Sequence, residues 1–183
     1  LLNIINQESY SPNWKAETRV NDIIKKGEEY YNLLYLSGEK IIMSAEDFKL
    51  AQDSVNTLKT HPYTQPLFLI NPFDQEHAKY FQLKFMLEDR ELPSPVRCMF
   101  DLIVVDHINK TIMPCDLKTT GKDESSFEES FLQWRYDLQA TLYSFILSKI
   151  ISEDDYFKAF TILPFRFIVI NRYNQTPLIW DFK

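Results

Sequence analysis

Two aspartates and a lysine in the middle of the chain have the types and the spacing of a metal-dependent hydrolytic site. Asp101 and Asp116 stand near the outer ends of two extended segments, and Lys118 follows Asp116 by two residues, which places both on one face of a strand. A hard divalent cation such as Mg²⁺ is the usual occupant of a site with oxygen ligands. Such a metal lowers the pKa of a bound water and polarises a phosphate, while Lys118 orients the water or offsets developing charge. The three residues therefore predict phosphodiester hydrolysis.

The elements that must position these residues are two strands joined by a tight turn. Leu102–Val105 is rich in β-branched residues, and Ile112–Leu117 resumes the extended character after a polar stretch. If the turn is centred between Ile108 and Asn109, the two aspartates lie directly opposite each other, with Cβ atoms about 4.5–5.5 Å apart. Pro114 lies inside the second strand and indicates an edge or a bulge, which would break this register. A reading of the same charges as solvated groups near strand ends stays open.

The order of an Asp, a short hairpin and Asp-x-Lys resembles the signature of the PD-(D/E)xK nuclease superfamily. Three segments, residues 97–101, 115–121 and 134–144, are similar to the RecE-type (exonuclease VIII-like) branch and to the RecB-like nucleases of phage or prophage origin. The third segment contains Gln139 and Tyr143, which match the Gln-x-x-x-Tyr helix of that branch. His61-Pro62 resembles the pair that ends an upstream helix in the same proteins, although a histidine at a helix end is more often structural.

The resemblance implies a restriction-endonuclease-like core and a Mg²⁺-dependent deoxyribonuclease, with Mn²⁺ as a substitute metal. The activity expected first is that of a 5′–3′ double-strand DNA exonuclease in phage-type DNA recombination. The residues expected to take part in catalysis are Asp101, Asp116, Lys118, Gln139 and Tyr143. The metal ligands are expected to be Asp101, Asp116 and the carbonyl of Leu117. Contacts to nucleic acid are expected from Thr119, Lys122 and Arg135, and Arg166 and Arg172 are further candidates for phosphate contacts.

The same resemblance implies double-stranded DNA as the substrate, a single-strand annealing protein as a partner and a ring-shaped homo-oligomer. Related enzymes carry a His or acidic metal ligand on a helix well before the first Asp. Leu1-Leu2 resembles the residues just after such a position, so we expect that ligand, and some native N-terminal residues, to precede Leu1. Two alternatives stay open: a restriction-type or structure-specific endonuclease of the same superfamily, and a catalytically inactive DNA-binding or assembly module.

Composition limits the class of protein. With 183 residues, of which 45% are hydrophobic, we expect a single globular nuclease domain over residues 1–183. A net charge of −6 excludes a broadly basic nucleic-acid binder but allows a local basic groove. Cys98 and Cys115 are offset in the proposed register, so we expect no disulfide and a reduced, cytoplasmic setting. Two cysteines are also too few for a four-Cys iron–sulfur cluster. No apolar run approaches the ~20 residues of a membrane span, so we expect no membrane partner.

Hydrophobic periodicity predicts two helices before the hairpin and one long helix after it. The first covers Lys15–Leu36 and stops at Gly38, and the second begins at the N-cap Ser44 and runs to about Thr60. The long helix is expected from about Phe127 to Ile151. Its apolar stripe would consist of Phe127, Phe131, Trp134, Leu138, Leu142 and Phe145, and a second stripe of Arg135, Gln139 and Tyr143 would lie beside it.

The remaining segments predict further strands and connections. Lys79–Glu88 alternates as a strand with one wet face, and Phe160–Ile170 and Pro177–Phe182 read as an antiparallel pair. Leu67–Phe73 reads as a short helical turn, and Gly121–Ser126 as a polar loop that could move over substrate. The expected fold class is therefore α/β (α+β), with a mixed central β-sheet flanked by helices.

Overall fold

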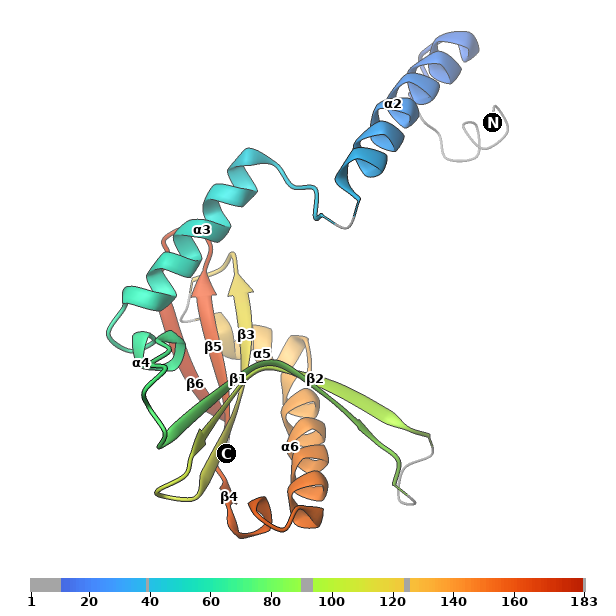
Figure 1. Ribbon diagram of the computed structural model, residues 1–183. Coiled ribbons are helices and arrows are strands. Elements are labelled where there is room, and N and C mark those ends of the chain that lie inside the picture. The colour runs from blue at the N-terminus through green and yellow to red at the C-terminus, as the bar shows by residue number, and fades with distance from the viewer. Residues whose placement is uncertain (1–10, 39, 90–93, 124–125, 183) are drawn as a thin grey trace. The chain divides into compact units, whose positions relative to one another are not determined.

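A computed structural model describes residues 11–38, 40–89, 94–123 and 126–182 of the chain (Figure 1). The chain forms two compact units, Leu1–Phe48 and Lys49–Lys183. The candidate site lies entirely in the second unit. The proline-punctuated turn at Glu91–Pro95 lies largely outside the described residues.

The described part of the first unit is dominated by helix α2, Ala16–Ser37, which confirms the predicted first helix. Gly38 ends it with φ 56°, in the left-handed region where a residue without a Cβ is not strained. Helix α3, Ala45–Thr60, begins at the predicted cap. The N–H of Asp47 donates to Ser44 Oγ at 3.0 Å, and the Ser44 hydroxyl donates to Asp47 Oδ2 at 2.7 Å, so both side chains fix the helix start.

The second unit is built on an open sheet of six strands, whose mixed strand directions confirm the predicted mixed central sheet. The strands are β1 His77–Leu87, β2 Val96–Asp106, β3 Thr111–Thr120, β4 Thr161–Ile162, β5 Phe165–Asn171 and β6 Pro177–Phe182. Their order is β1-β2-β3-β5-β6, with β4 beside β3. Strands β3 and β5 are parallel, whereas β1–β2, β2–β3 and β5–β6 are antiparallel pairs. The predicted strand Phe160–Ile170 is interrupted at Leu163-Pro164, because Pro164 has no N–H to donate to a ladder.

The register of the β2–β3 hairpin is the one predicted from the sequence. Val105 pairs with Ile112 and Leu102 pairs with Cys115, and the intervening pairs follow without a bulge. Pro114 sits in this regular ladder opposite Ile103, so the expected bulge is wrong. Backbone groups alternate sides along a strand, and the carbonyl of Ile112 already faces the β4–β5 side, where it accepts the N–H of Leu163. Pro114 therefore turns its missing N–H towards the interruption between β4 and β5, where no ladder bond is lost.

Helices cover both faces of this sheet (Figure 1). On one face, α5 Phe127–Gln133 and α6 Tyr136–Glu153 pack their buried side chains on Phe100, Phe165 and Phe167. On the other face, Leu58 of α3 and Leu67 of the short helix α4, Gln65–Phe68, pack against the sheet. The 3-10 helix η2, Phe157–Ala159, follows α6. None of the helices in the described part of the chain is both long and apolar enough to span a bilayer.

The two cysteines lie in these two separate cores. Cys98 belongs to the core under α5 and α6, Cys115 belongs to the core under α4, and both thiols are free. Burial raises the pKa of Cys98 to about 11 and that of Cys115 to about 12. The absence of a bond between Cys98 and Cys115 agrees with the sequence prediction.

The predicted long helix is wrong at one point: it breaks into α5 and α6 at Trp134 and Arg135. Arg135 adopts φ 53°, a left-handed conformation that ends one helix before the next begins. The break rotates α6 relative to the predicted apolar stripe. Trp134 and Leu138 are therefore 65% and 55% exposed, while Ala140, Ile146 and Leu147 are buried instead.

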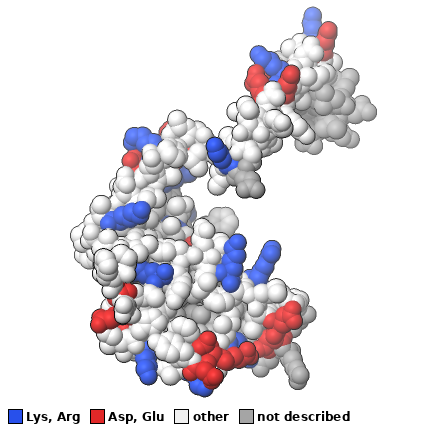
Figure 2. Space-filling model, in the orientation of Figure 1, with Lys and Arg blue, Asp and Glu red and all other residues white. Residues whose placement is uncertain are grey.

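Charged side chains are unevenly spread over the face of the second unit seen in Figure 2. Acidic side chains gather along its lower edge, and the basic ones stand apart from one another, most of them above that edge. This distribution agrees with the net charge of −6. Any basic groove on this face is therefore local.

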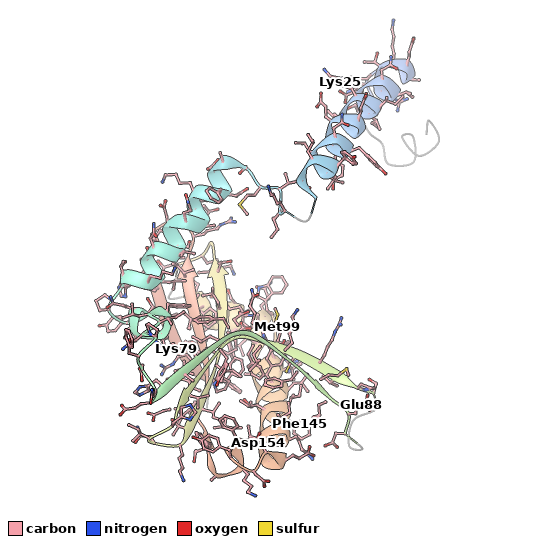
Figure 3. All side chains as sticks on the ribbon, in the orientation of Figure 1. Lys25, Lys79, Glu88, Met99, Phe145 and Asp154 are labelled. Atoms are coloured by element: carbon pink, nitrogen blue, oxygen red, sulfur yellow. The ribbon has the colours of Figure 1, made fainter. Side chains whose placement is uncertain are left out.

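In the middle of β1 and β2, the alternation of side chains between the two faces of the sheet is inverted. On β2, Cys98 and Phe100 point to the core under α6, but so do Ile103 and Val105, which have the opposite parity. On β1, the same inversion occurs at Gln82, which has φ 52°. The ladder passes from the pair Phe81–Leu102 to the pair Leu83–Phe100, and Gln82 and Asp101 between them do not pair. Beyond this switch, the paired residues Leu83–Leu87 of β1 and Val96–Phe100 of β2 form an arm that curves away from β3 (Figure 1). Met99 lies on the side of this arm that faces away from Phe145 of α6 (Figure 3).

Candidate active site

Asp101 lies where the two strands of the hairpin separate. Pairing of β2 with β3 ends at Leu102–Cys115, one step before the two aspartates. In place of a backbone carbonyl, Oδ2 of Asp101 accepts the N–H of Leu117 at 2.8 Å. The N–H and C=O of one strand residue point to the same side, so the Leu117 carbonyl also faces this opening. Asp101 is also unpaired on its other side, because the β1–β2 ladder has no pair between Gln82 and Asp101.

Asp116 is a buried carboxylate, with an exposed fraction of 5%. Its Oδ1 accepts a hydrogen bond from Nε2 of Gln139 at 2.7 Å. Its Oδ2 lies 2.6 Å from Nζ of Lys118, so the ammonium is the partner of this buried oxygen. Burial raises the pKa of Asp116, the ion pair with Lys118 opposes that rise, and the charge of Asp101 adds to it.

Lys118 stands between three groups on the side of α6. Besides its ion pair with Asp116, its Nζ donates to Oε1 of Gln139 at 3.0 Å. The same Nζ lies 4.4 Å from the ring centroid of Tyr136, within the range of a cation–π contact. Gln139 uses its amide nitrogen on Asp116 and its amide oxygen on Lys118. The glutamine thus fixes the positions of both charged groups.

Tyr136 is a site residue that the sequence reasoning missed. It lies three residues before Gln139 in α6, which places both on one face of the helix. That spacing was available in the sequence, but the assumption of one unbroken helix favoured Arg135 as the neighbour of Gln139. The predicted stripe of Arg135, Gln139 and Tyr143 is therefore wrong, because Arg135 is the residue before α6 and not part of it.

Tyr143 lies away from the carboxylates. Its ring packs on Phe100 and Phe165, with ring centroids 5.2 and 6.3 Å away. Of the two residues taken from the Gln-x-x-x-Tyr pattern, the structure brings Gln139 to the aspartates and places Tyr143 at the edge of the core. It also lines a separate cavity with Arg97 and Lys84.

Asp101 and Asp116 are both among the residues that line one cavity of about 450 Å³ on the α4 side of the sheet, while the carboxylate of Asp116 itself is held by Gln139 on the α6 side. The cavity is lined by Phe68, Phe81, Gln82, Asp101, Leu102, Cys115, Asp116, Leu117 and Ile168. Gln82 is the strained member, since a residue with a Cβ is disfavoured at φ 52°. Backbone strain of this kind persists where the surrounding structure imposes it, and it gathers at functional sites.

The residues expected to contact nucleic acid fall into two groups. Thr119 and Lys122 are both exposed and line a small cavity of about 190 Å³ together with Lys118 and Tyr136. The backbone of Lys122 is anchored, because its carbonyl accepts Nδ2 of the buried Asn171 at 2.9 Å. This hydrogen bond fixes the start of the predicted loop Gly121–Ser126, of which residues 124 and 125 lie outside the described part.

The arginine candidates are differently placed. Arg135 forms two hydrogen bonds of 3.0 Å with the carboxylate of Asp137, and Arg166 forms a similar pair with Asp181. Arg172 lies over the ring of Tyr173, 4.7 Å from its centroid. Arg135 and Arg166 would have to exchange a carboxylate for a phosphate in order to contact DNA.

The donor set at the aspartates fits a hard divalent cation. Two carboxylates and one carbonyl supply oxygen alone, the chemistry that Mg²⁺ prefers. Within the described ranges, no group of three or more His, Cys, Asp or Glu side chains is close enough to hold a metal. Waters would therefore have to complete the octahedral shell around the ion, as is common for Mg²⁺.

Comparison with known proteins assigns the chain to no family. No protein-family model matches the sequence, and no curated protein sequence matches it.

Proposed function

We propose that this protein is a Mg²⁺-dependent deoxyribonuclease that hydrolyses DNA phosphodiester bonds. The observation that carries the proposal is the pair of aspartates at the open end of the hairpin, Asp101 and Asp116, which are close enough for the charge of Asp101 to raise the pKa of Asp116, with Lys118 at 2.6 Å from Asp116. A buried carboxylate with a raised pKa costs stability unless a ligand compensates for it. The resemblance to the PD-(D/E)xK superfamily supports the same assignment.

Each residue of the site has a defined task in this proposal. Asp101, Asp116 and the Leu117 carbonyl would hold the cation, which lowers the pKa of a bound water and polarises the phosphate when it is bound. Lys118 would then leave its ion pair with Asp116 and donate a hydrogen bond to the attacking water or to the phosphate oxygen on which negative charge develops. Gln139 and the Tyr136 ring keep the Lys118 ammonium in position for that exchange.

The finer proposal is a 5′–3′ exonuclease on double-stranded DNA in phage-type recombination. It rests on the resemblance of the three segments to RecE-type enzymes, as do the annealing-protein partner and the ring-shaped oligomer. A restriction-type or structure-specific endonuclease would use the same residues, since nothing in the carboxylate geometry distinguishes an end from an internal bond.

Digestion of linear and of closed circular duplex DNA separates these activities. We expect Mg²⁺ to promote loss of the linear substrate alone, EDTA to prevent it, and Lys118→Ala to abolish it. Lys110→Ala is the matched control, because Lys110 is an exposed lysine in the turn at the opposite end of the same hairpin. Cleavage of the circle would instead indicate an endonuclease, and full activity of Lys118→Ala would refute the assignment of the site.

A further inference from the structure

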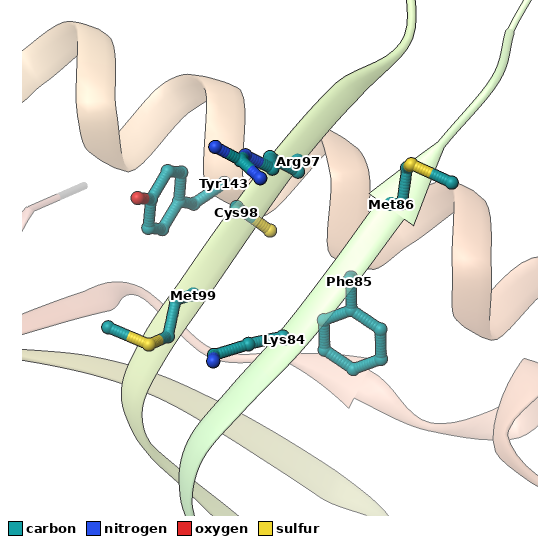
Figure 4. Close-up of a pocket in the computed structure, with 7 residues that line it drawn as sticks. All are labelled: Lys84, Phe85, Met86, Arg97, Cys98, Met99 and Tyr143. Atoms are coloured by element: carbon teal, nitrogen blue, oxygen red, sulfur yellow. The ribbon is translucent and has the colours of Figure 1, made fainter. Parts of the chain in front are cut away.

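A second cavity lies on the arm formed by β1 and β2 beyond the face switch. It has a volume of about 600 Å³ and is lined by Lys84, Phe85, Met86, Arg97, Cys98, Met99 and Tyr143 (Figure 4). In this part of the arm β2 has no pairing with β3, because the hairpin ladder ends at Leu102–Cys115. The cavity therefore opens along a stretch of β2 that leads directly to Asp101.

Four long side chains share the outer face of this arm. Lys84 pairs with Met99, and Met86 pairs with Arg97, and residues directly opposite in an antiparallel ladder point to the same face. We call these four residues the arm patch. All four are exposed, with Met86 at 69% and Met99 at 38%, whereas the alternate residues Phe85 and Cys98 point to the core under α6.

The two cations of the arm patch are available to an anion. Over the described part of the chain, neither Lys84 nor Arg97 takes part in an ion pair, while the acid Asp89 near the end of the arm is held by Lys149. This sets them apart from Arg135 and Arg166, which carboxylates already occupy. Unpaired cations in a cavity attract phosphate groups, even on a protein with a net negative charge.

The apolar members of the cavity favour an unpaired strand over a duplex. Met86 and Met99 are exposed thioethers, and Tyr143 presents its ring beside Arg97 (Figure 4). Flexible thioethers and aromatic rings contact the faces of bases, which are open in a single strand and covered by stacking in a duplex. Met99 precedes Asp101 by two residues, or about 7 Å of strand, and Arg97 precedes it by about 13 Å.

From this arrangement we infer that the arm patch binds a single strand of DNA, which it delivers to the Asp101–Asp116 site. The phosphates contact Lys84 and Arg97, and the bases contact the thioethers of Met86 and Met99. The inference rests on the proposed nuclease function for its choice of DNA. It adds that the strand is unpaired before it reaches the carboxylates.

Binding of a fluorescein-labelled oligothymidylate of about 12 residues to the full chain, followed by anisotropy in EDTA, tests this inference. The key variant is Lys84→Gln/Arg97→Gln. Lys59→Gln/Lys110→Gln is the matched control, because it removes the same charge from exposed lysines outside the arm patch. Each lost phosphate contact reduces the slope of log K against log salt by about 0.7 for a single strand. At 0.1 M salt, each such loss amounts to about fivefold in affinity.

We expect the Lys84/Arg97 double variant to bind about 25-fold more weakly, with a slope smaller by about 1.4, and the control pair to bind like the wild type. Met99→Ala should weaken binding without changing the slope, because it removes a base contact and no charge. Unchanged binding by the double variant, an equal loss in the control pair, or equal affinity for a blunt duplex of the same length would overturn the inference. A chain that binds through the arm patch yet cuts no DNA with Mg²⁺ would contradict the nuclease proposal alone.

Discussion

The β2–β3 hairpin carries Asp106 near its turn and the pair Asp101 and Asp116 at its open end. The surroundings shift the pKa values of Asp106 and Asp116 in opposite directions. At the turn, Asp106 accepts the N–H groups of Ile108 and Asn109 at 3.0 and 2.8 Å and the Asn109 side-chain amide at 2.7 Å. These hydrogen bonds, led by the backbone N–H of Asn109, hold the pKa of Asp106 below its ordinary value. This carboxylate is satisfied by its own turn and belongs to the structure.

At the open end, Asp116 is buried and its pKa is raised by that burial, although Gln139 and Lys118 both contact its carboxylate. One oxygen of Asp101 accepts the N–H of Leu117, and the charge of Asp101 adds to the rise in the pKa of Asp116. The difference teaches which of several acids in one hairpin is a candidate for chemistry. A buried carboxylate whose pKa is raised points to a ligand, whereas a carboxylate whose pKa is lowered by the hydrogen bonds of its own turn does not.

The largest expected effect separates the two ends directly. Asp116→Asn keeps the shape of the side chain but removes a ligand charge, and we expect it to lower Mg²⁺-dependent cleavage by about 10³-fold or more. Asp106→Asn, the matched change at the turn, should leave cleavage unchanged and lower the melting temperature. Cleavage rates measured on linear duplex DNA check both, and equal losses in the two variants would break the comparison.

Lys118→Met comes next, because it removes the ammonium while keeping the length of the side chain. We expect cleavage to fall by about 10²–10³-fold, the usual loss when a group that stabilises developing charge is removed. In the metal-free protein the same variant should raise the pKa of Asp116 further, since the ion pair opposes the effect of burial. Single-turnover cleavage and the carboxyl signal followed by NMR would report the two effects, and retained cleavage would exclude Lys118 from the mechanism.

Gln139→Leu should have a smaller effect, of about 10–100-fold on cleavage, because Gln139 acts by holding Asp116 and Lys118. A positioning role predicts that Gln139→Glu, which keeps the acceptor for Lys118, recovers part of the rate and that the pH profile of cleavage shifts. If Gln139→Leu changed only the melting temperature, the role of Gln139 would be structural.

The sequence was sufficient for the hairpin and insufficient for its surroundings, for physical reasons. In an antiparallel hairpin one pair of opposite residues determines all the others, so placing Asp101 opposite Asp116 also predicts the pairs from Leu102–Cys115 towards the turn. The structure contains these pairs. The helix break at Arg135 follows neither a glycine nor a proline, so no local signal marks it. Gln82 is equally unmarked, because glutamine has no preference for a positive φ, and the face switch there emerges only from packing on both sides of the sheet.

The two ends should also give opposite pH dependences of stability in EDTA. The raised pKa of Asp116 means that the folded state holds an extra proton just above the ordinary Asp value of about 3.9, so stability falls as pH rises through that window. The lowered pKa of Asp106 contributes stability above the ordinary value, which is lost as pH falls through the lowered one. Melting temperatures of Asp116→Asn and Asp106→Asn between about pH 3 and about pH 7 should therefore deviate from the wild type in opposite directions. Deviations of the same sign would contradict the assignment.

The smallest effect concerns two residues with φ 52°, Gln82 beside the site and Lys110 in the hairpin turn. Replacement by glycine removes the strain of the positive φ, while the greater entropy of glycine in the unfolded chain opposes this gain. Because the strain is the larger effect, the free energy of unfolding of each variant should rise by about 0.5 kcal/mol. Gln82→Gly should also lower cleavage, because the strain there orients Asp101, whereas Lys110→Gly should not. Urea denaturation and cleavage assays on both variants measure the contrast, and equal cleavage would show that the strain at Gln82 has no role in the site.

The most direct test of the central claim is binding of Mn²⁺, observed by electron paramagnetic resonance, to the wild type and to Asp101→Asn/Asp116→Asn and Asp106→Asn. We predict that the double variant loses the bound ion, that Asp106→Asn retains it, and that Mg²⁺ displaces it. Retention of Mn²⁺ by the double variant, or its loss in Asp106→Asn, would contradict the assignment of the open end of the hairpin as the metal site.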